Sequence, residues 1–137
     1  MSKFHLWVSM LPLSAALAGC ALEKTSTPLS PSVAGPIPGV GISAPSTMEP
    51  AQGSRILDSA QPLTLVVENA TTTGVRPLSY SFEVATDGDF NQRVFHRDGV
   101  TPGEGGRTSV RLPDRLASGR TYYWRSRAGD GANAGRY

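Results

Sequence analysis

The chain has little cysteine, little histidine and no long apolar run. Its single cysteine, Cys20, leaves no partner for a disulfide within the chain. The two histidines have neither the HxH nor the HExxH spacing of zinc sites, so neither a zinc centre nor a Ser-His-Asp triad is expected. The most apolar segment, Leu6–Ala18, has about 13 residues, fewer than the ~20 that span a bilayer. We therefore expect no catalytic residue, no cofactor and no metal.

The short apolar run ends at the cysteine. Leu17, Ala18 and Gly19 stand directly before Cys20, and a basic residue precedes the run. A positive start, about 7–15 apolar residues and small residues at the end are typical of a signal peptide. The Leu-Ala-Gly-Cys sequence resembles the lipobox of bacterial lipoprotein precursors. The resemblance implies that signal peptidase recognises Leu17, Ala18 and Gly19 and removes residues 1–19. It also implies that Cys20 carries a diacylglyceryl group and commonly an N-acyl chain such as palmitate.

The predicted anchor also bears on location. Two or more acyl chains hold a protein stably on a bilayer, whereas one chain does so only marginally. In Gram-negative lipoproteins, aspartate directly after the lipidated cysteine tends to retain the protein in the inner membrane, and here that position is Ala21. We therefore expect a membrane-bound protein of the bacterial cell envelope and, in a Gram-negative source, one in the outer membrane rather than the inner one.

Residues 20–52 are rich in Pro, Ser, Thr and Gly and have no sustained period of 2 or 3.6 residues. Prolines hold a segment extended and keep it out of a sheet. They stand at Pro28, Pro31, Pro36, Pro38, Pro45 and Pro50. We predict a solvated tether, and thirty residues at ~3.1 Å each would extend roughly 90 Å.

Residues 53–137 alternate apolar and polar residues in short runs separated by turn residues. The runs are Leu63–Val67, Tyr80–Val84, Val94–His96, Thr108–Leu112 and Thr121–Ala128. A period of two residues is typical of strands with one buried face, so Tyr80, Phe82 and Val84 are predicted to face inward and Glu83 outward. Short strands with polar turns predict an all-β fold, an antiparallel β-sandwich.

The last run resembles the E–F corner and strand F of a fibronectin type III module. Leu116 precedes Tyr122 by the six residues that separate the family's leucine from the tyrosine that opens strand F. The resemblance implies an immunoglobulin-like sandwich in which the hydroxyl of Tyr122 bonds to upstream backbone, the tyrosine corner. Such a module ends with a strand G, for which few residues remain after Asp130. We expect a C-terminally incomplete domain and a chain that is a fragment, or a strand F edge covered by the tether or a partner.

Alternation in the last run gives it two different faces. Trp124 is predicted to face inward, and Tyr123, Arg125 and Arg127 outward. Arginine beside an aromatic ring suits carboxylates, phosphates or sugars, so these three residues are the candidate contacts for a protein or glycan partner. Removing residues 1–19 takes one basic residue from 13 and leaves 12 against 11 acidic ones, a net charge of +1. Nucleic-acid binding is therefore not expected.

Two polar motifs have an alternative interpretation. Asp87–Asn91 has oxygen side chains at alternate positions, as calcium loops do, but glycine and glutamate are missing from the sixth and twelfth places. We interpret it as a polar turn with Phe90 packed under it. His96 and Asp98 could form a His–carboxylate pair, but an exposed strand histidine is favoured.

These observations predict a non-catalytic, lipid-anchored module that acts as a spacer or a binding and adhesion domain. Its partners would be the membrane and a protein or glycan. One alternative is the N-terminal part of a surface-anchored hydrolase with the sandwich as an accessory domain. A second is a carbohydrate-binding module, which needs a row of exposed aromatic residues, and only Tyr123 and Phe95 are available for it.

Overall fold

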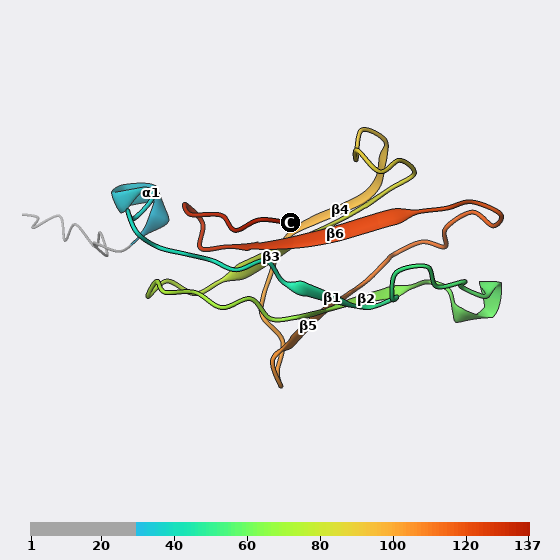
Figure 1. The fold of residues 1–137 in the computed structure, drawn as a ribbon, viewed down its shortest axis with the longest axis horizontal. Helices are drawn as coiled ribbons and strands as arrows, with labels where there is room; N and C mark the ends of the chain where they lie inside the picture. Colours follow the sequence, from blue (N-terminus) through green and yellow to red (C-terminus); the bar gives the residue numbers. More distant parts are fainter. Residues whose placement is uncertain (1–29) are drawn as a thin grey trace, which may run out of the picture.

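The computed structural model describes residues 30–137, which form two three-stranded antiparallel sheets packed face to face (Figure 1). One sheet has the strand order β1-β2-β5 and the other β4-β3-β6. The predicted all-β sandwich is therefore confirmed. The signal peptide predicted for residues 1–19 and the lipidation site Cys20 lie outside the described residues.

The strands are short, as the alternating runs predict. The first sheet is made of β1 (Ser46–Glu49), β2 (Thr64–Glu68) and β5 (Arg107–Arg111). The second is made of β4 (Arg93–Val100), β3 (Ser79–Ala85) and β6 (Tyr123–Gly129). Two single helical turns, α1 (Pro31–Ala34) and a 3₁₀ turn at Asp58–Ala60, complete the described elements. Within residues 30–137, no helix has the length and apolar character needed to cross a membrane.

The core lies between the two sheets and consists of the inward residues of the alternating runs. It contains Leu65, Val67, Tyr80, Phe82, Val84, Val110, Leu112 and Ala128. The predicted inward direction of Tyr80, Phe82 and Val84 is confirmed. The buried hydroxyl of Tyr80 accepts a hydrogen bond from the N–H of Ala70 at 2.8 Å, so its polar group has a partner.

β1 lies inside the segment predicted to be a tether. It pairs antiparallel with β2 at the edge of the first sheet. The prediction that prolines keep residues 20–52 out of the sheet is therefore wrong for residues 46–49. Pro45 and Pro50 flank β1 without interrupting it, and an edge strand tolerates proline at its ends. The folded domain thus begins before the predicted boundary at Gly53.

Residues 35–43, which we call the strap, are also part of the folded domain. The Asn133 side chain forms two hydrogen bonds with the Ile37 backbone, one as acceptor and one as donor. The Ile37 N–H donates to Asn133 Oδ1 at 3.0 Å, and Asn133 Nδ2 donates to the Ile37 carbonyl at 3.0 Å. Further along, Ile42 forms an antiparallel bridge with Thr72. These contacts fix the strap against the β2–β3 connection and the turn after β6.

A buried ion pair lies under the strap. Arg76 Nη1 is 3.7 Å from Asp130 Oδ1, and the two side chains are only 3% and 2% exposed. The same nitrogen donates to the carbonyl of Gly35 at 2.8 Å, so the pair also holds the strap. Asp130 Oδ1 further accepts the N–H groups of Ala132 and Asn133 at 3.0 and 2.6 Å. Burial alone would raise the pKa of Asp130, but these hydrogen bonds and the Arg76 charge outweigh it and hold the pKa below its usual value.

The sandwich therefore has two different ends. The strap end consists of the strap, the β2–β3 connection (residues 69–78) and the turn at residues 130–133. The far end consists of the connections at residues 50–63, 86–92 and 112–122. From the strap end, residues 134–137 run back along β6, where Ala134 bridges Gly129. The last four residues thus begin to pair with the free edge of β6.

Candidate functional site: an arginine and aromatic face

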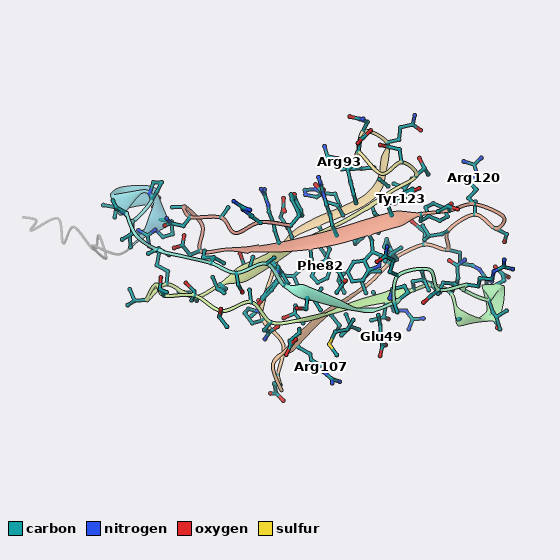
Figure 2. All side chains as sticks on the ribbon, in the orientation of Figure 1. Glu49, Phe82, Arg93, Arg107, Arg120 and Tyr123 are labelled. Carbon is teal, nitrogen blue, oxygen red and sulfur yellow. The ribbon has the colours of Figure 1, made fainter. Side chains whose placement is uncertain are left out.

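The outer face of sheet β4-β3-β6 carries the three predicted contact residues. Pairing of β6 with β3 places Arg125 opposite Glu83. Tyr123 and Arg127, two positions to either side of Arg125, share its face because side chains alternate along a strand. Figure 2 shows Tyr123 and Arg93 on this outer side and Phe82 between the sheets. The three residues face outward in the structure, as the alternation of the strand predicts.

Glu83 lies at the centre of this face and is buried, with 2% of its surface exposed. Its Oε1 accepts a hydrogen bond from Arg93 Nη1 at 2.8 Å. Its Oε2 is 2.7 Å from both Nε and Nη2 of Arg125. The pattern correctly gave Glu83 an outward direction, but arginines from both neighbouring strands cover it. Nothing in the local sequence pairs Glu83 with these arginines, so sequence reasoning missed this centre.

The carboxylate of Glu83 is held in its charged form. Burial alone would raise the pKa of Glu83, but the hydrogen bonds and charges of Arg125 and Arg93 outweigh it and lower the pKa from its usual 4.5. The ionised carboxylate therefore stabilises the fold fully above pH 4.5, and this contribution is lost as the pH falls through the lowered pKa.

Glu83→Gln is accordingly expected to lower the free energy of unfolding by about 1–2 kcal/mol at pH 7, because charge-assisted hydrogen bonds are replaced by weaker ones. The difference in free energy of unfolding between this variant and the wild type should stay constant from pH 7 to pH 5 and shrink below pH 4.5. Urea titrations at each pH, followed by circular dichroism, measure it. A difference that grows on acidification would contradict the paired carboxylate.

The guanidinium group of Arg125 is held on both sides by aromatic rings. Its Cζ is 3.9 Å from the ring centroid of Phe90 and 3.8 Å from that of Tyr137. Cζ of Arg127 is 5.0 Å from the Tyr137 ring. Such stacking of arginine on aromatic faces is a cation–π arrangement. Arg125 therefore organises the face, while Tyr123, which is 44% exposed, presents its ring to solvent.

The Asp87 turn supports this stack from the β3–β4 connection. The Asp87 carboxylate accepts the N–H groups of Asp89, Asn91 and Gln92 at 3.1, 3.0 and 2.7 Å. Hydrogen bonds from Asn91 and Gln92 lower the pKa of Asp87. Phe90 takes a positive φ of 59° in this turn, which turns its ring onto Arg125. Asp87 thus acts as a turn cap, and the part of the chain that the structure describes has no cluster of three metal-ligating side chains.

The hydroxyl of Tyr122 has the hydrogen bonds predicted for a tyrosine corner. It accepts the N–H of Ala117 at 3.0 Å and donates to the carbonyl of the same residue at 3.3 Å. Leu116 packs against the core beside it. The corner fixes the β5–β6 connection at the point where β6 begins, and thereby fixes the position of Tyr123 on the outer face.

Tyr122→Phe is expected to lower the free energy of unfolding by about 1 kcal/mol, because the Ala117 backbone loses its partner while the ring remains. Tyr123→Phe is the matched control, since no hydrogen bond of its hydroxyl is part of the corner. Chemical denaturation of both variants measures the difference. Equal stabilities would contradict a structural role for the Tyr122 hydroxyl.

Two other aromatic residues belong to the core side of the sheet. Trp124 is partly buried against the core, as its predicted inward direction requires, and its Nε1 donates to the carbonyl of Pro50 at 3.3 Å. Phe95 on β4 also packs against the core. Phe95 is therefore not part of an exposed aromatic row with Tyr123.

The His96 and Asp98 pair is on the surface of β4. His96 Nε2 lies 3.2 Å from Asp98 Oδ1, and the side chains are 44% and 61% exposed. Exposed pairs of this kind contribute little to stability. The predicted exposed strand histidine is confirmed, and its carboxylate neighbour lies within hydrogen-bonding distance.

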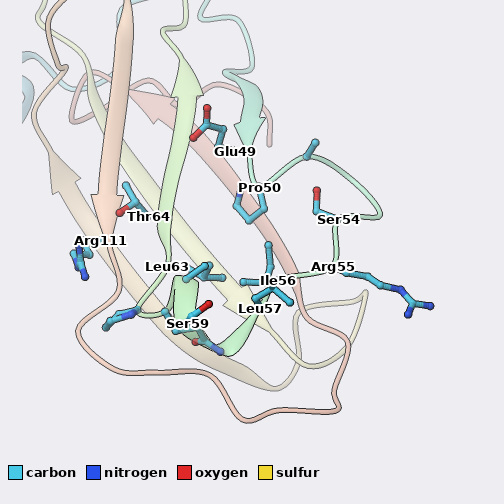
Figure 3. Close-up of a pocket in the computed structure, with 14 residues that line it drawn as sticks. Glu49, Pro50, Ser54, Arg55, Ile56, Leu57, Ser59, Leu63, Thr64 and Arg111 are labelled. Atoms are coloured by element: carbon cyan, nitrogen blue, oxygen red, sulfur yellow. The ribbon is translucent and has the colours of Figure 1, made fainter.

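An open groove of about 700 Å³ lies at the far end, where β1, β2 and β5 meet the residue 50–63 connection (Figure 3). Ile56, Leu57 and Leu63 give it an apolar wall beside Pro50. Its lining includes one carboxylate, that of Glu49, and neither histidine nor cysteine. The groove thus brings no acid and base together.

Comparison of the chain with models of protein families, with curated proteins and with solved structures gives no match in any of the three. The arginine and aromatic face is therefore the feature from which a function is best inferred. It combines a buried carboxylate, three arginines and aromatic rings on one side of a rigid sheet. Such an arrangement can bind a partner.

Proposed function

We propose that the chain is a lipid-anchored protein of the bacterial cell envelope whose fibronectin type III-like sandwich is a non-catalytic spacer or binding module. The strand orders β1-β2-β5 and β4-β3-β6 support this domain class, together with the hydrogen bonds of Tyr122 at the corner before β6. The Leu-Ala-Gly sequence before Cys20 supports the anchor.

The observation that carries the binding role is the arginine and aromatic face. The face carries three positive charges, from Arg93, Arg125 and Arg127. Glu83 and Asp98 carry two negative charges, which leaves a formal excess of +1. Arginine and tyrosine are enriched among the residues that dominate protein interfaces. A protein partner with surface carboxylates fits this face best. Arg93, whose side chain is 52% exposed, and Tyr123 are its accessible contacts.

The anchor is tested by metabolic labelling. Bacteria that express the full chain are grown with radiolabelled palmitate, and the wild type is compared with Cys20→Ser. The wild type is expected to incorporate the label and to fractionate with membranes, and Cys20→Ser is expected to do neither, because it lacks the acylated sulfur. Equal labelling of the two proteins, or no labelling of the wild type, would refute the anchor.

A further inference from the structure

We infer that the strap end of the sandwich lies on the lipid surface, with Val33 and Val75 at the headgroup boundary. This inference rests on the proposed lipidation of Cys20 and assigns a partner, the bilayer itself, to a particular end of the domain. Three independent observations support it: the length of chain between the anchor and the sandwich, the absence of exposed charge at the tip of this end, and its exposed apolar side chains.

The chain between the lipid and the sandwich is much shorter than the predicted tether. The strap is fixed to the sandwich from Gly35 onward, and the described chain enters at Ser30, ten residues after Cys20. Ten residues at ~3.1 Å extend about 31 Å, compared with roughly 90 Å for the predicted tether. The seven residues of β6 alone extend about 23 Å away from this end. The lipid is therefore attached at the strap end, and the short connection keeps the sandwich close to the bilayer.

The segments at the tip of the strap end have no exposed charged side chain. Residues 31–45, 69–78 and 130–133 include only two charged residues, Arg76 and Asp130, and these are buried against each other. The far end is different. It exposes Arg55, Asp58, Asp89, Asp114, Arg115 and Arg120. A charged side chain resists entry into the apolar boundary of a bilayer, whereas small, hydroxyl and apolar side chains do not.

Two exposed apolar residues lie at this tip. Val75 at the tip of the β2–β3 connection is 74% exposed, and Val33 in α1 is 61% exposed. Figure 1 shows α1 and the β2–β3 connection extending from the same end of the sandwich. Exposed charges begin at the base of this end, with Glu68 directly before Asn69, Glu104 in the connection whose Gly106 carbonyl accepts the Asn69 N–H, and Arg136 after the Ala134–Gly129 bridge. The tip that faces the lipid therefore carries two exposed valines and no exposed charge.

The orientation can be tested with fluorescence quenching by brominated phospholipids. Residues 20–137 contain one tryptophan, Trp124, so a Trp124→Phe background leaves no native tryptophan. Val75→Trp reports on the strap end and Leu57→Trp on the far end. The two positions are matched, since their native side chains are 74% and 73% exposed. Val33→Trp is a second reporter at the strap end, and circular dichroism verifies that each variant is folded.

The chain of residues 20–137 is coupled through the Cys20 thiol to a maleimide phospholipid in phosphatidylcholine vesicles, so the test does not depend on bacterial lipidation. Val75→Trp and Val33→Trp should lose at least about half of their emission when brominated lipid replaces ordinary lipid, and Leu57→Trp should change little. Equal quenching at both ends, stronger quenching of Leu57→Trp, or no quenching at either end would overturn the inference. Failure of palmitate labelling in cells would instead overturn the anchor alone.

Discussion

Asp130→Ala is expected to lower the free energy of unfolding by about 3–5 kcal/mol, because removing one partner of a buried ion pair leaves the other charge uncompensated. Arg76 would remain 5% exposed beneath the strap without its carboxylate. The N–H groups of Ala132 and Asn133 would lose their acceptor as well. Urea denaturation at pH 7, followed by circular dichroism, measures the loss.

Two further variants separate the causes of this loss. Asp130→Asn keeps an oxygen acceptor for the turn but removes the charge. It should therefore destabilise the protein less than Asp130→Ala does. Asp114→Ala removes an exposed carboxylate and should change stability by less than about 0.5 kcal/mol. A loss below about 1 kcal/mol for Asp130→Ala would mean that the pair under the strap is not buried in solution.

Trp124→Ala is expected to cost about 3–4 kcal/mol, because truncating a large core aromatic residue leaves a cavity that the surroundings fill only in part. Trp124 stands on β6 of one sheet, and its Nε1 bonds to Pro50 directly after β1 of the other. The residue thus connects the two sheets by packing and by a hydrogen bond. The midpoint of urea denaturation, followed by circular dichroism because no tryptophan remains after residue 19, measures the effect.

The neighbouring residue provides the control for this variant. Tyr123→Ala removes an aromatic ring of similar size from the exposed outer face of the same strand, and it should cost well under 1 kcal/mol. Trp124→Phe keeps the packing and loses the hydrogen bond to Pro50, so it should cost about 1 kcal/mol. Similar losses for Trp124→Ala and Tyr123→Ala would show that the inner and outer faces of β6 have been assigned wrongly.

The strands and core could be predicted because their signal is local. Tyr80, Phe82 and Val84 alternate with polar residues, and an alternating run that buries one face has few other stable conformations. β1 escaped prediction because Ser46–Glu49 has no apolar alternation and lies between two prolines. It joins the sheet by pairing with β2, and that contact has no signature in its own sequence.

The candidate site was only partly predictable for the same reason. The outward direction of Tyr123, Arg125 and Arg127 follows from the period of the strand. The burial of Glu83 does not, because it depends on arginines that come from both neighbouring strands. The contacts of the strap join residues that lie even farther apart in the sequence. Ile37 and Asn133 are 96 residues apart, and neither residue type indicates such a contact by itself.

The strap also determines how the domain responds to mechanical force. It is attached to the β2–β3 connection by the Ile42–Thr72 bridge and the Arg76 hydrogen bond, and to the turn after β6 by the Asn133 amide. The attachments at Gly35, Ile37 and Ile42 follow one another along the strap, so tension on the chain before it reaches the Gly35 hydrogen bond first. The edge strand β1 begins at Ser46 and is loaded only after all three have broken. The strap thus shields the edge of the first sheet from a pull on the N-terminal side of the domain.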